Sequence, residues 1–323
     1  MLRLTLGAGL MVIILAMACA GGSGPKAKPW LGLSSTRGLI LYNETLTGDI
    51  VAMDIDSGKQ LRQPPASLED YTMAVDCTPD GHLSVRASVD YADELSRLSV
   101  AGEGAADGPL KVQGIVQGVT WSPDGRRIAL SSYDSRTATS GLWLADVATG
   151  ELSSLPAGPG PAGPLRWSPD GRQLLFTATQ GNDTLVYALE IGQAEPVQLF
   201  ARSGAFESDW SPDGKTLVFS TADANSQFQL FEVNTDGSGE RQLTTSDTSK
   251  ASPRWSEDGS TIAFAATIQV PQVSRVANRL HHVAVWLVNA DGTGERSLTD
   301  VAPDAWPLAW CLPGPWLEGW TEK

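Results

Sequence analysis

Charged residues stand directly before four of the six copies of a repeated pentapeptide, and they are the first candidates for chemistry. The pentapeptide is WSPDG at Trp121, Trp167 and Trp210 and WSEDG at Trp255, with looser copies at Cys77 and Trp310. The residues before the copies are Asp76, Thr120, Arg166, Asp209, Arg254 and Ala309. If the copies are equivalent places in a repeated unit, these side chains form a ring that either holds a ligand or ion or pairs internally. Pairing is the favoured interpretation, because buried charges are usually paired.

A long segment near the end of the chain is the second candidate. Ile268–His282 (IQVPQVSRVANRLHH) is longer than the corresponding segments after Ser131, Thr177 and Ser220. Its positive charge, which is unusual in this acidic chain, comes from Arg275, Arg279, His281 and His282. Insertions of this kind map to one face of a repeat protein and often bind, and Trp306 in DVAPDAWP is expected near that face. The alternative is that this segment is an insertion without a binding role, which the fold tolerates.

Motifs of the common enzyme classes give no catalytic residue. The patterns G-x-S-x-G, H-E-x-x-H and C-x-x-C are absent, and the only histidines are His82, His281 and His282, too few for a His-rich metal centre. Gly158–Gly163 spells G-x-G-x-x-G, but its prolines remove N–H donors and a strand rather than a helix is expected next. NTDGSGE (Asn234–Glu240) and NADGTGE (Asn289–Glu295) are interpreted as turns rather than calcium loops. No cofactor or metal is predicted.

The pentapeptide itself predicts a tight turn between two antiparallel strands. Ser, Pro and Gly stand at the first, second and fourth positions that a type I turn prefers. An apolar segment begins three residues past the Gly in the best copies, as at Ile128 and Leu217. A second apolar segment, another turn and a short third segment follow before the next Trp, as in QLFEVNTDGSGE and then Arg241–Thr244. Each repeat is therefore expected to contain four short strands, here called A, B, C and D, with A ending at the Trp.

The spacing of the repeats predicts the architecture. The six anchors are 44, 46, 43, 45 and 55 residues apart, and four strands in such a period are typical of a β-propeller blade. The first B–C–D set, near Leu39, lacks an A strand, and the last A strand, near Trp310, lacks a complete set. We therefore predict an all-β, six-bladed propeller closed by N-terminal B–C–D strands and a C-terminal A strand. Each Trp is expected to wedge against the neighbouring blade.

The repeated pattern WSPDG…(I/L)AF…L(F/W)…DG…GE…LT resembles the TolB-like six-bladed propeller repeat over about residues 38–314, most closely at 119–300. The resemblance implies that the mouth of the channel binds another envelope protein. TolB carries an α/β domain ahead of its propeller, for which the residues between Ala20 and Leu39 are too few. We therefore expect a TolB-like repeat protein rather than TolB itself.

The start of the chain has the pattern of an export signal. Met1–Arg3 is a basic head, and Leu4–Ala18 is an apolar run too short to span a bilayer comfortably. Leu15-Ala16-Met17-Ala18-Cys19 resembles the bacterial lipobox, in which the Cys is lipidated, although Ala16 stands where Leu is preferred. The alternative is ordinary cleavage at Ala18 or Ala20. Residues 1–18 are thus read as a signal peptide, 19–37 as a flexible tether and 38–323 as one propeller domain.

Composition and cysteine content limit the partners and the covalent links. The chain has 41% hydrophobic and 19% charged residues, which is typical of a folded protein, and its net charge of −14 argues against nucleic acid and anionic membrane surfaces as partners. Cys77 and Cys311 remain after lipidation of Cys19 and occupy equivalent places in two repeats. A disulfide would suit an oxidising compartment. Two small buried thiols are the favoured interpretation.

These observations favour a non-enzymatic, lipid-anchored binding protein of the periplasm or cell surface, with an envelope protein, a peptide or a small ligand as its partner. One alternative is a metal-dependent lactonase or lyase centred on the channel, with Asp76 and Asp209 as ligands. Another is a propeller that serves a separate hydrolase, and a third is a purely structural spacer.

Overall fold

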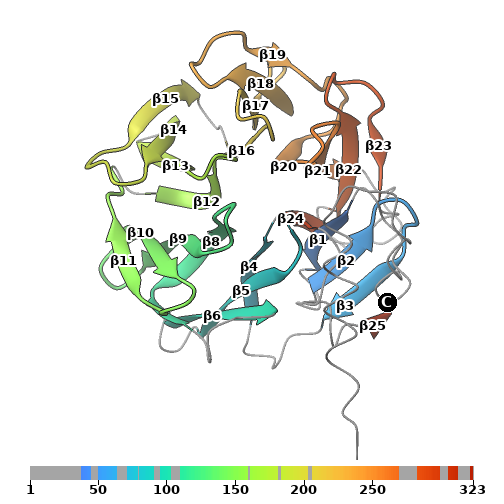
Figure 1. Ribbon diagram of the computed structural model, residues 1–323. Coiled ribbons are helices and arrows are strands. Elements are labelled where there is room, and N and C mark those ends of the chain that lie inside the picture. The colour runs from blue at the N-terminus through green and yellow to red at the C-terminus, as the bar shows by residue number, and fades with distance from the viewer. Residues whose placement is uncertain are drawn as a thin grey trace, which may run out of the picture.

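The structure is a computed structural model that describes residues 38–44, 50–63, 71–78, 80–90, 95–102, 110–158, 161–180, 183–202, 206–268, 282–298, 305–311 and 321–322. All regular structure in these ranges is β strand, arranged as six antiparallel sheets around a ring (Figure 1). The predicted six-bladed propeller is confirmed. No helix in the described part is long and apolar enough to cross a membrane.

The strands follow the predicted A–B–C–D order in every blade. Blade 1 contains β4 (Tyr71–Cys77), β5 (Leu83–Asp90), β6 (Leu95–Gly102) and β7 (Leu110–Gln113). Blade 2 contains β8 (Ile115–Trp121), β9 (Arg127–Asp134), β10 (Thr139–Asp146) and β11 (Leu152–Leu155). Blade 3 contains β12 (Pro161–Trp167), β13 (Gln173–Gln180), β14 (Asp183–Glu190) and β15 (Val197–Arg202).

The second half of the ring continues this order and returns to the start of the chain. Blade 4 contains β16 (Phe206–Trp210), β17 (Thr216–Ala222), β18 (Phe228–Asn234) and β19 (Arg241–Gln242). Blade 5 contains β20 (Lys250–Trp255), β21 (Thr261–Ile268), β22 (His282–Asn289) and β23 (Arg296–Ser297). Blade 6 contains β24 (Ala305–Cys311), β1 (Leu39–Glu44), β2 (Ile50–Asp54), β3 (Gln60–Gln63) and β25 (Thr321–Glu322).

The predicted A–B turn is present with all its hydrogen bonds. In blade 2 the Gly125 N–H donates to Ser122 O at 2.9 Å, and Gly125 has a φ of 66°, which favours glycine. The Ser122 hydroxyl donates to Asp124 Oδ1 at 2.6 Å and accepts from the Arg127 N–H at 2.9 Å. Equivalent bonds recur at Ser168, Ser211 and Ser256. The pentapeptide therefore carries shape rather than chemistry.

The anchor tryptophans hold neighbouring blades together, as predicted. Trp167 of blade 3 packs with Ala129 and Leu142 of blade 2, and the Arg127 guanidinium lies 4.9 Å from its ring centroid. Trp121, Trp210 and Trp255 are likewise buried in clusters that include residues of the preceding blade. Each indole therefore removes apolar surface of two blades from water, which no blade can do alone.

Both ends of the chain build blade 6. The C-terminal β24 pairs with β1 in the register Leu39↔Cys311 and Ile40↔Trp310, so the predicted closure is confirmed. β25 adds a fifth strand by pairing with β3, a role that the sequence did not predict for the tail. The preference for two separate thiols is wrong, because Cys77 of β4 and Cys311 of β24 form a disulfide. Equivalent positions of adjacent inner strands come close in a propeller, which brings the two cysteines within bonding reach.

The ring has two faces with different loops. We call the end that carries the A–B turns (122–126, 168–172, 211–215 and 256–260) the turn face. We call the opposite end, which carries the B–C turns 135–138 and 223–227 and the connection 243–249 from blade 4 to blade 5, the loop face. Because strands alternate in direction, the start of every A strand and the end of every B strand lie at the loop face.

Candidate functional site

The four charged residues of the predicted ring lie on β4, β12, β16 and β20, the innermost strands of their blades (Figure 1). Asp76 Oδ2 accepts a hydrogen bond from the backbone N–H of Trp121 at 2.9 Å, and Asp209 Oδ2 accepts one from the backbone N–H of Trp255 at 2.8 Å. Each carboxylate thus joins its own inner strand to that of the following blade. From the sequence these two carboxylates were candidate ligands, and in the structure each one makes a hydrogen bond that connects two blades.

The arginines of the ring are paired with acids, as the sequence interpretation favoured. Arg166 Nε lies 3.8 Å from Asp209 Oδ1, and Arg254 Nη2 lies 3.1 Å from Glu207 Oε2. Each guanidinium also donates to a backbone carbonyl next to it, Arg166 to Leu165 O and Arg254 to Pro253 O. These contacts supply the hydrogen bonds and opposite charges that mostly buried guanidinium groups require.

Burial shifts the pKa values of the ionisable side chains in the ring in the direction that favours their neutral forms. Burial raises the pKa of the Asp76 and Asp209 carboxyls, and the nearby Arg166 and the backbone N–H groups of the tryptophans offset part of that rise. Burial, reinforced by the neighbouring Arg254, lowers the pKa of Arg166, while Asp209 and Asp76 oppose this shift. The acids and arginines of the ring therefore depend on one another for their charge.

Glu207 is a member of this cluster that the sequence reasoning missed. It lies two residues before Asp209 and has a φ of 39°, at a register shift between Phe206 and Ser208 in the ladder with β17. Simple alternation along β16 would have given Glu207 no special role. A positive φ is costly for a residue with a Cβ, so the surrounding structure must hold Glu207 in this conformation.

A pocket of about 390 Å³ opens between blades 4 and 5 at the loop face. It is formed by the beginnings of β16, β18, β20 and β22 and by the end of β21, all of which lie at that face. Its lining residues are Glu207, Phe228, Ser249, Lys250, Ala251, Ser252, Ala265, Thr267 and Val283. Ser252, like Glu207, has a positive φ, here 53°, and it lies within the register shift of the β20–β21 ladder. The A–B ladder of every blade has such a register shift, and the shifts of blades 4 and 5 meet in this pocket.

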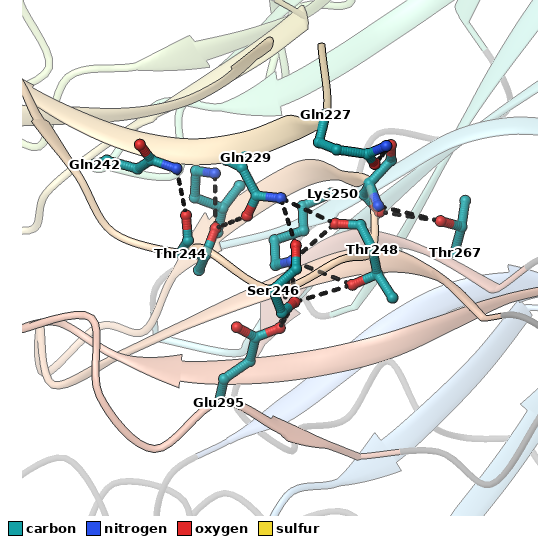
Figure 2. Close-up of polar contacts among 11 residues, drawn as sticks. Gln227, Gln229, Gln242, Thr244, Ser246, Thr248, Lys250, Thr267 and Glu295 are labelled. Carbon is teal, nitrogen blue, oxygen red and sulfur yellow. Dashed lines mark hydrogen bonds and ion pairs between the residues drawn. The ribbon is translucent and has the colours of Figure 1, made fainter. Parts of the chain in front are cut away.

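Among the residues that line this pocket, Lys250 is a buried cation whose side chain is 0% exposed (Figure 2). Its ammonium donates to Ser246 Oγ at 2.7 Å, to Thr248 O at 2.9 Å and to Thr248 Oγ1 at 3.2 Å, and it lies 3.4 Å from Glu295 Oε1. Burial lowers the Lys250 pKa, and the Glu295 carboxylate opposes that shift. Lys250 thus links the connection 243–249 to the outer part of blade 5.

Gln229 fixes the same connection from blade 4 (Figure 2). Its amide nitrogen donates to Ser246 O at 2.8 Å and to Thr248 O at 3.2 Å, and its carbonyl oxygen accepts from the Thr244 hydroxyl at 2.8 Å. Figure 2 shows these side chains converging on the connection from the two blades. The edge of the pocket that begins at Ser249 is therefore held rigidly in place.

The two segments considered for calcium have other contacts. Asp236 Oδ1 accepts from the Ser238 N–H and hydroxyl, and Asp291 Oδ1 accepts from those of Thr293. Glu295 accepts from Ser246 and pairs with Lys250. In the described part of the chain, no three His, Cys, Asp or Glu residues gather as a metal site would require.

The remaining predicted residues are only partly described. Arg275, Arg279, His281 and Cys19 lie outside the described residues. The backbone of His282 begins β22 opposite Ile268, and that of Trp306 lies in β24 opposite Asn43. Both positions are at the loop-face ends of their strands, in adjacent blades 5 and 6 that contact each other through β22 and β24. The expected proximity of Trp306 to that face therefore holds for the backbone.

Comparisons with known proteins agree with the repeat pattern. The TolB β-propeller domain family matches residues 110–309. The chain is 38% identical over 61 residues to the Tol-Pal system protein TolB of Alcanivorax borkumensis, covering 19% of this chain and 14% of that protein. It is 35% identical over 79 residues to dipeptidyl-peptidase 5 of Porphyromonas endodontalis, covering 24% of this chain and 10% of that protein. The matches thus span only a small part of both curated relatives.

The solved structure of TolB from Acinetobacter baumannii has the same fold. It superposes with a TM-score of 0.66 at 18% identity, covering 85% of this chain and 67% of that one. At this identity the likeness concerns the fold alone. The family match, however, extends over more than half of the chain and includes four of the anchor tryptophans and Arg166, Asp209 and Arg254. The chain belongs to the TolB β-propeller domain family.

Proposed function

We propose that this protein is a non-enzymatic binding protein anchored in the bacterial envelope, and that it engages a protein partner at the loop face and the mouth of the channel. A propeller of this family is suited to act as a protein-binding scaffold. The observation that carries the proposal is the pocket at the loop face and the unusual residues that gather in it. The pocket, the positive-φ residues Glu207 and Ser252 and the buried Lys250 all lie between blades 4 and 5.

Lys250 illustrates how far this region departs from the repeat. The residue five positions before the anchor is Val116, Ala162 and Ala205 in blades 2, 3 and 4, and it is Lys250 in blade 5. A buried cation with four acceptors around it is costly to build, and the fold does not need one in the other blades. Such a local exception is typical of a site under functional selection.

The segment between β21 and β22 is proposed as part of the contact surface. Thr267 and Val283 line the pocket on either side of that segment. Its Arg275 and Arg279, together with His281, His282 and Trp306, would offer basic and aromatic groups, which are frequent among residues that dominate binding energy. Because the remainder of the chain is acidic, this local positive charge favours a partner with an acidic surface there.

Deleting residues 270–279 tests the contact surface. We expect the melting temperature to change little and capture of the partner from a detergent extract of the native membranes to be lost. A sharper variant, Arg275→Ala with Arg279→Ala, should weaken capture without shortening the chain. The matched control is Arg126→Ala with Arg172→Ala, which removes two exposed arginines from the turn face. Capture that survives the deletion would contradict the proposal.

Envelope anchoring is proposed from the N-terminal pattern alone. Residues 1–18 would direct export, Cys19 would carry the lipid, and residues 19–37 would tether the propeller in the periplasm or at the cell surface. The Cys77–Cys311 disulfide is consistent with an oxidising compartment. Cys19→Ser should move the protein from the membrane fraction to the soluble fraction and abolish metabolic labelling with a fatty acid. Retention of both properties would argue against lipidation.

A second candidate is a propeller that serves a hydrolase. The match to dipeptidyl-peptidase 5, at 35% identity, is the observation that favours it. In that case gentle purification from the native membranes should recover a hydrolase with the chain. A channel-centred metal enzyme would instead be indicated by stoichiometric Ca²⁺ or Zn²⁺ in the purified protein, lost on Asp76→Asn or Asp209→Asn.

A further inference from the structure

The pocket between blades 4 and 5 offers hydrogen-bond acceptors to a ligand. The Glu207 side chain is 26% exposed, and Arg254 occupies only its Oε2. Its other oxygen, Oε1, makes no hydrogen bond within the described part of the chain, and the same is true of the Ser252 hydroxyl. Both residues line the pocket. A ligand with N–H donors would therefore find acceptors without displacing existing bonds.

The donors around the same pocket are already engaged. The Lys250 ammonium is surrounded by Ser246, Thr248 and Glu295. The Arg254 guanidinium donates to Pro253 O and to Glu207. The Ser249 hydroxyl donates to Gln227 Oε1. An anionic ligand would consequently meet the Glu207 carboxylate without a donor to offset it, and the net charge of −14 adds repulsion at longer range.

Apart from Thr267, whose hydroxyl bonds to the backbone of Ser249, the remaining walls of the pocket are apolar. Phe228, Ala251, Ala265 and Val283 line it, and its volume of about 390 Å³ lies within the range of small-molecule sites. Contact between these walls and a hydrocarbon stem removes apolar surface from water and favours binding. A second charged group on the ligand would find no partner there. The pocket therefore matches one charged donor at the end of an apolar chain.

We propose that this pocket binds a protonated amine or guanidinium on an apolar stem, namely the end of a lysine or arginine side chain of the protein that docks on the loop face. This inference rests on the proposed function, and it adds the chemistry of the anchoring residue. The aliphatic stem would pack on Phe228 and Val283, and the cationic head would donate to Glu207 Oε1 and the Ser252 hydroxyl. The net negative charge of the protein would contribute attraction at longer range.

Three probes of equal length test the chemistry in the purified protein. n-Hexylammonium, n-hexanol and hexanoate are titrated by saturation-transfer NMR. We expect hexylammonium to bind at least about tenfold more tightly than hexanol, with no detectable binding of hexanoate, because a hydrogen bond to a charged group typically contributes that much. Hexanoate binding as well as hexylammonium would overturn the proposal.

Variants locate the binding. Glu207→Gln keeps an acceptor for Arg254 but removes the charge, and it should weaken hexylammonium binding about tenfold or more. Ala251→Leu fills the pocket from its edge and should abolish binding of both hexylammonium and hexanol. Glu195→Gln makes the same charge change at an exposed position of the opposite face and should have no effect. Thermal melting verifies that each variant is folded, and unchanged affinity in the first two variants would refute the site.

Capture of the partner distinguishes this inference from the proposed function. Reduced capture by Glu207→Gln and by Ala251→Leu, with normal capture by Glu195→Gln, supports the docked side chain. If both pocket variants bind hexylammonium poorly yet capture the partner normally, the cation does not come from the docking protein and the inference fails. Loss of capture on deletion of 270–279 would in that case still uphold docking on the loop face.

Discussion

The A–B turns and the pocket between blades 4 and 5 are built from equivalent segments of the same repeat, yet they differ in how their polar groups are used. In a turn such as Ser211–Thr216, the hydroxyl and the carboxylate bond only to their own turn. In the pocket, Glu207 and Ser252 each retain an acceptor that bonds to no described residue. The polar groups of the turns thus maintain the fold, whereas those of the pocket are available for binding.

The carboxyl groups of the two regions also titrate in opposite directions. Hydrogen bonds from the turn lower the pKa of Asp124, Asp170 and Asp213, the last to about 2. Burial on the inner strands raises the pKa of Asp76 and Asp209. A carboxylate that accepts several N–H and O–H bonds at the surface is favoured in its charged form, whereas desolvation favours the neutral form.

Removal of an anchor indole should have the largest effect on stability. Trp167→Ala deletes a side chain buried between blades 2 and 3, and we expect the free energy of unfolding to fall by about 3–5 kcal/mol. Val197→Ala, at a side chain that is 64% exposed, is the control and should change it by less than about 0.5 kcal/mol. Chemical denaturation measures both. Equal effects would mean that the repeated Trp does not hold the blades together.

The disulfide should follow. The variant with Cys77→Ser and Cys311→Ser loses a covalent link between β4 and β24 across a sequence separation of 234 residues. We expect a loss of about 2–4 kcal/mol, because the unfolded chain gains freedom. Addition of a reductant to the wild-type protein should reproduce this loss but leave the double variant unchanged. Identical unfolding curves with and without reductant in the wild type would show that the link contributes nothing.

Two Lys250 variants separate the structural role of this side chain from the role of its charge in the pocket between blades 4 and 5. Lys250→Ala leaves a cavity and frees Glu295 and Thr248 from their partner, so we expect a loss of about 2 kcal/mol. Lys250→Met keeps most of the volume without a buried charge and should be within about 1 kcal/mol of the wild type. If Met costs as much as Ala, the ammonium contacts rather than the packing dominate at this position.

The smallest effect is expected from the carboxylates of the A–B turns, which should lose their contribution to stability at acidic pH. Because the pKa of Asp213 is about 2 in the folded protein and 3.8 ordinarily, its contribution is complete above about pH 4 and is lost as the pH falls toward 2. Asp124 and Asp170 act in the same direction. Melting temperatures between pH 5 and pH 2 should fall less steeply in Ser211→Ala, which lacks the bond from the hydroxyl to Asp213. An unchanged slope would argue against this linkage.

Much of the fold follows from short stretches of sequence. Ser-Pro-Asp-Gly forms its turn through hydrogen bonds within the turn itself. Apolar segments follow each turn at a constant spacing, so the number of strands and blades can be counted from the sequence. The unmatched strand sets at the two ends similarly predict closure through β24 and β1. These features depend on residues close together in the chain, which is why a single sequence is sufficient to predict them.

The site depends on contacts between residues far apart, and only the tertiary structure decides them. The sequence pointed to Arg166, Asp209 and Arg254 by their place in the repeat, but not to Glu207, whose role arises from a register shift and a positive φ. The sequence allowed a Cys77–Cys311 disulfide, but two separate thiols were the favoured interpretation. Equivalent places in the repeat do not by themselves show how closely two inner strands approach each other. Local hydrogen bonding and alternation determined the blades, whereas the packing of one blade against the next determined the pocket, the Lys250 contacts and the disulfide.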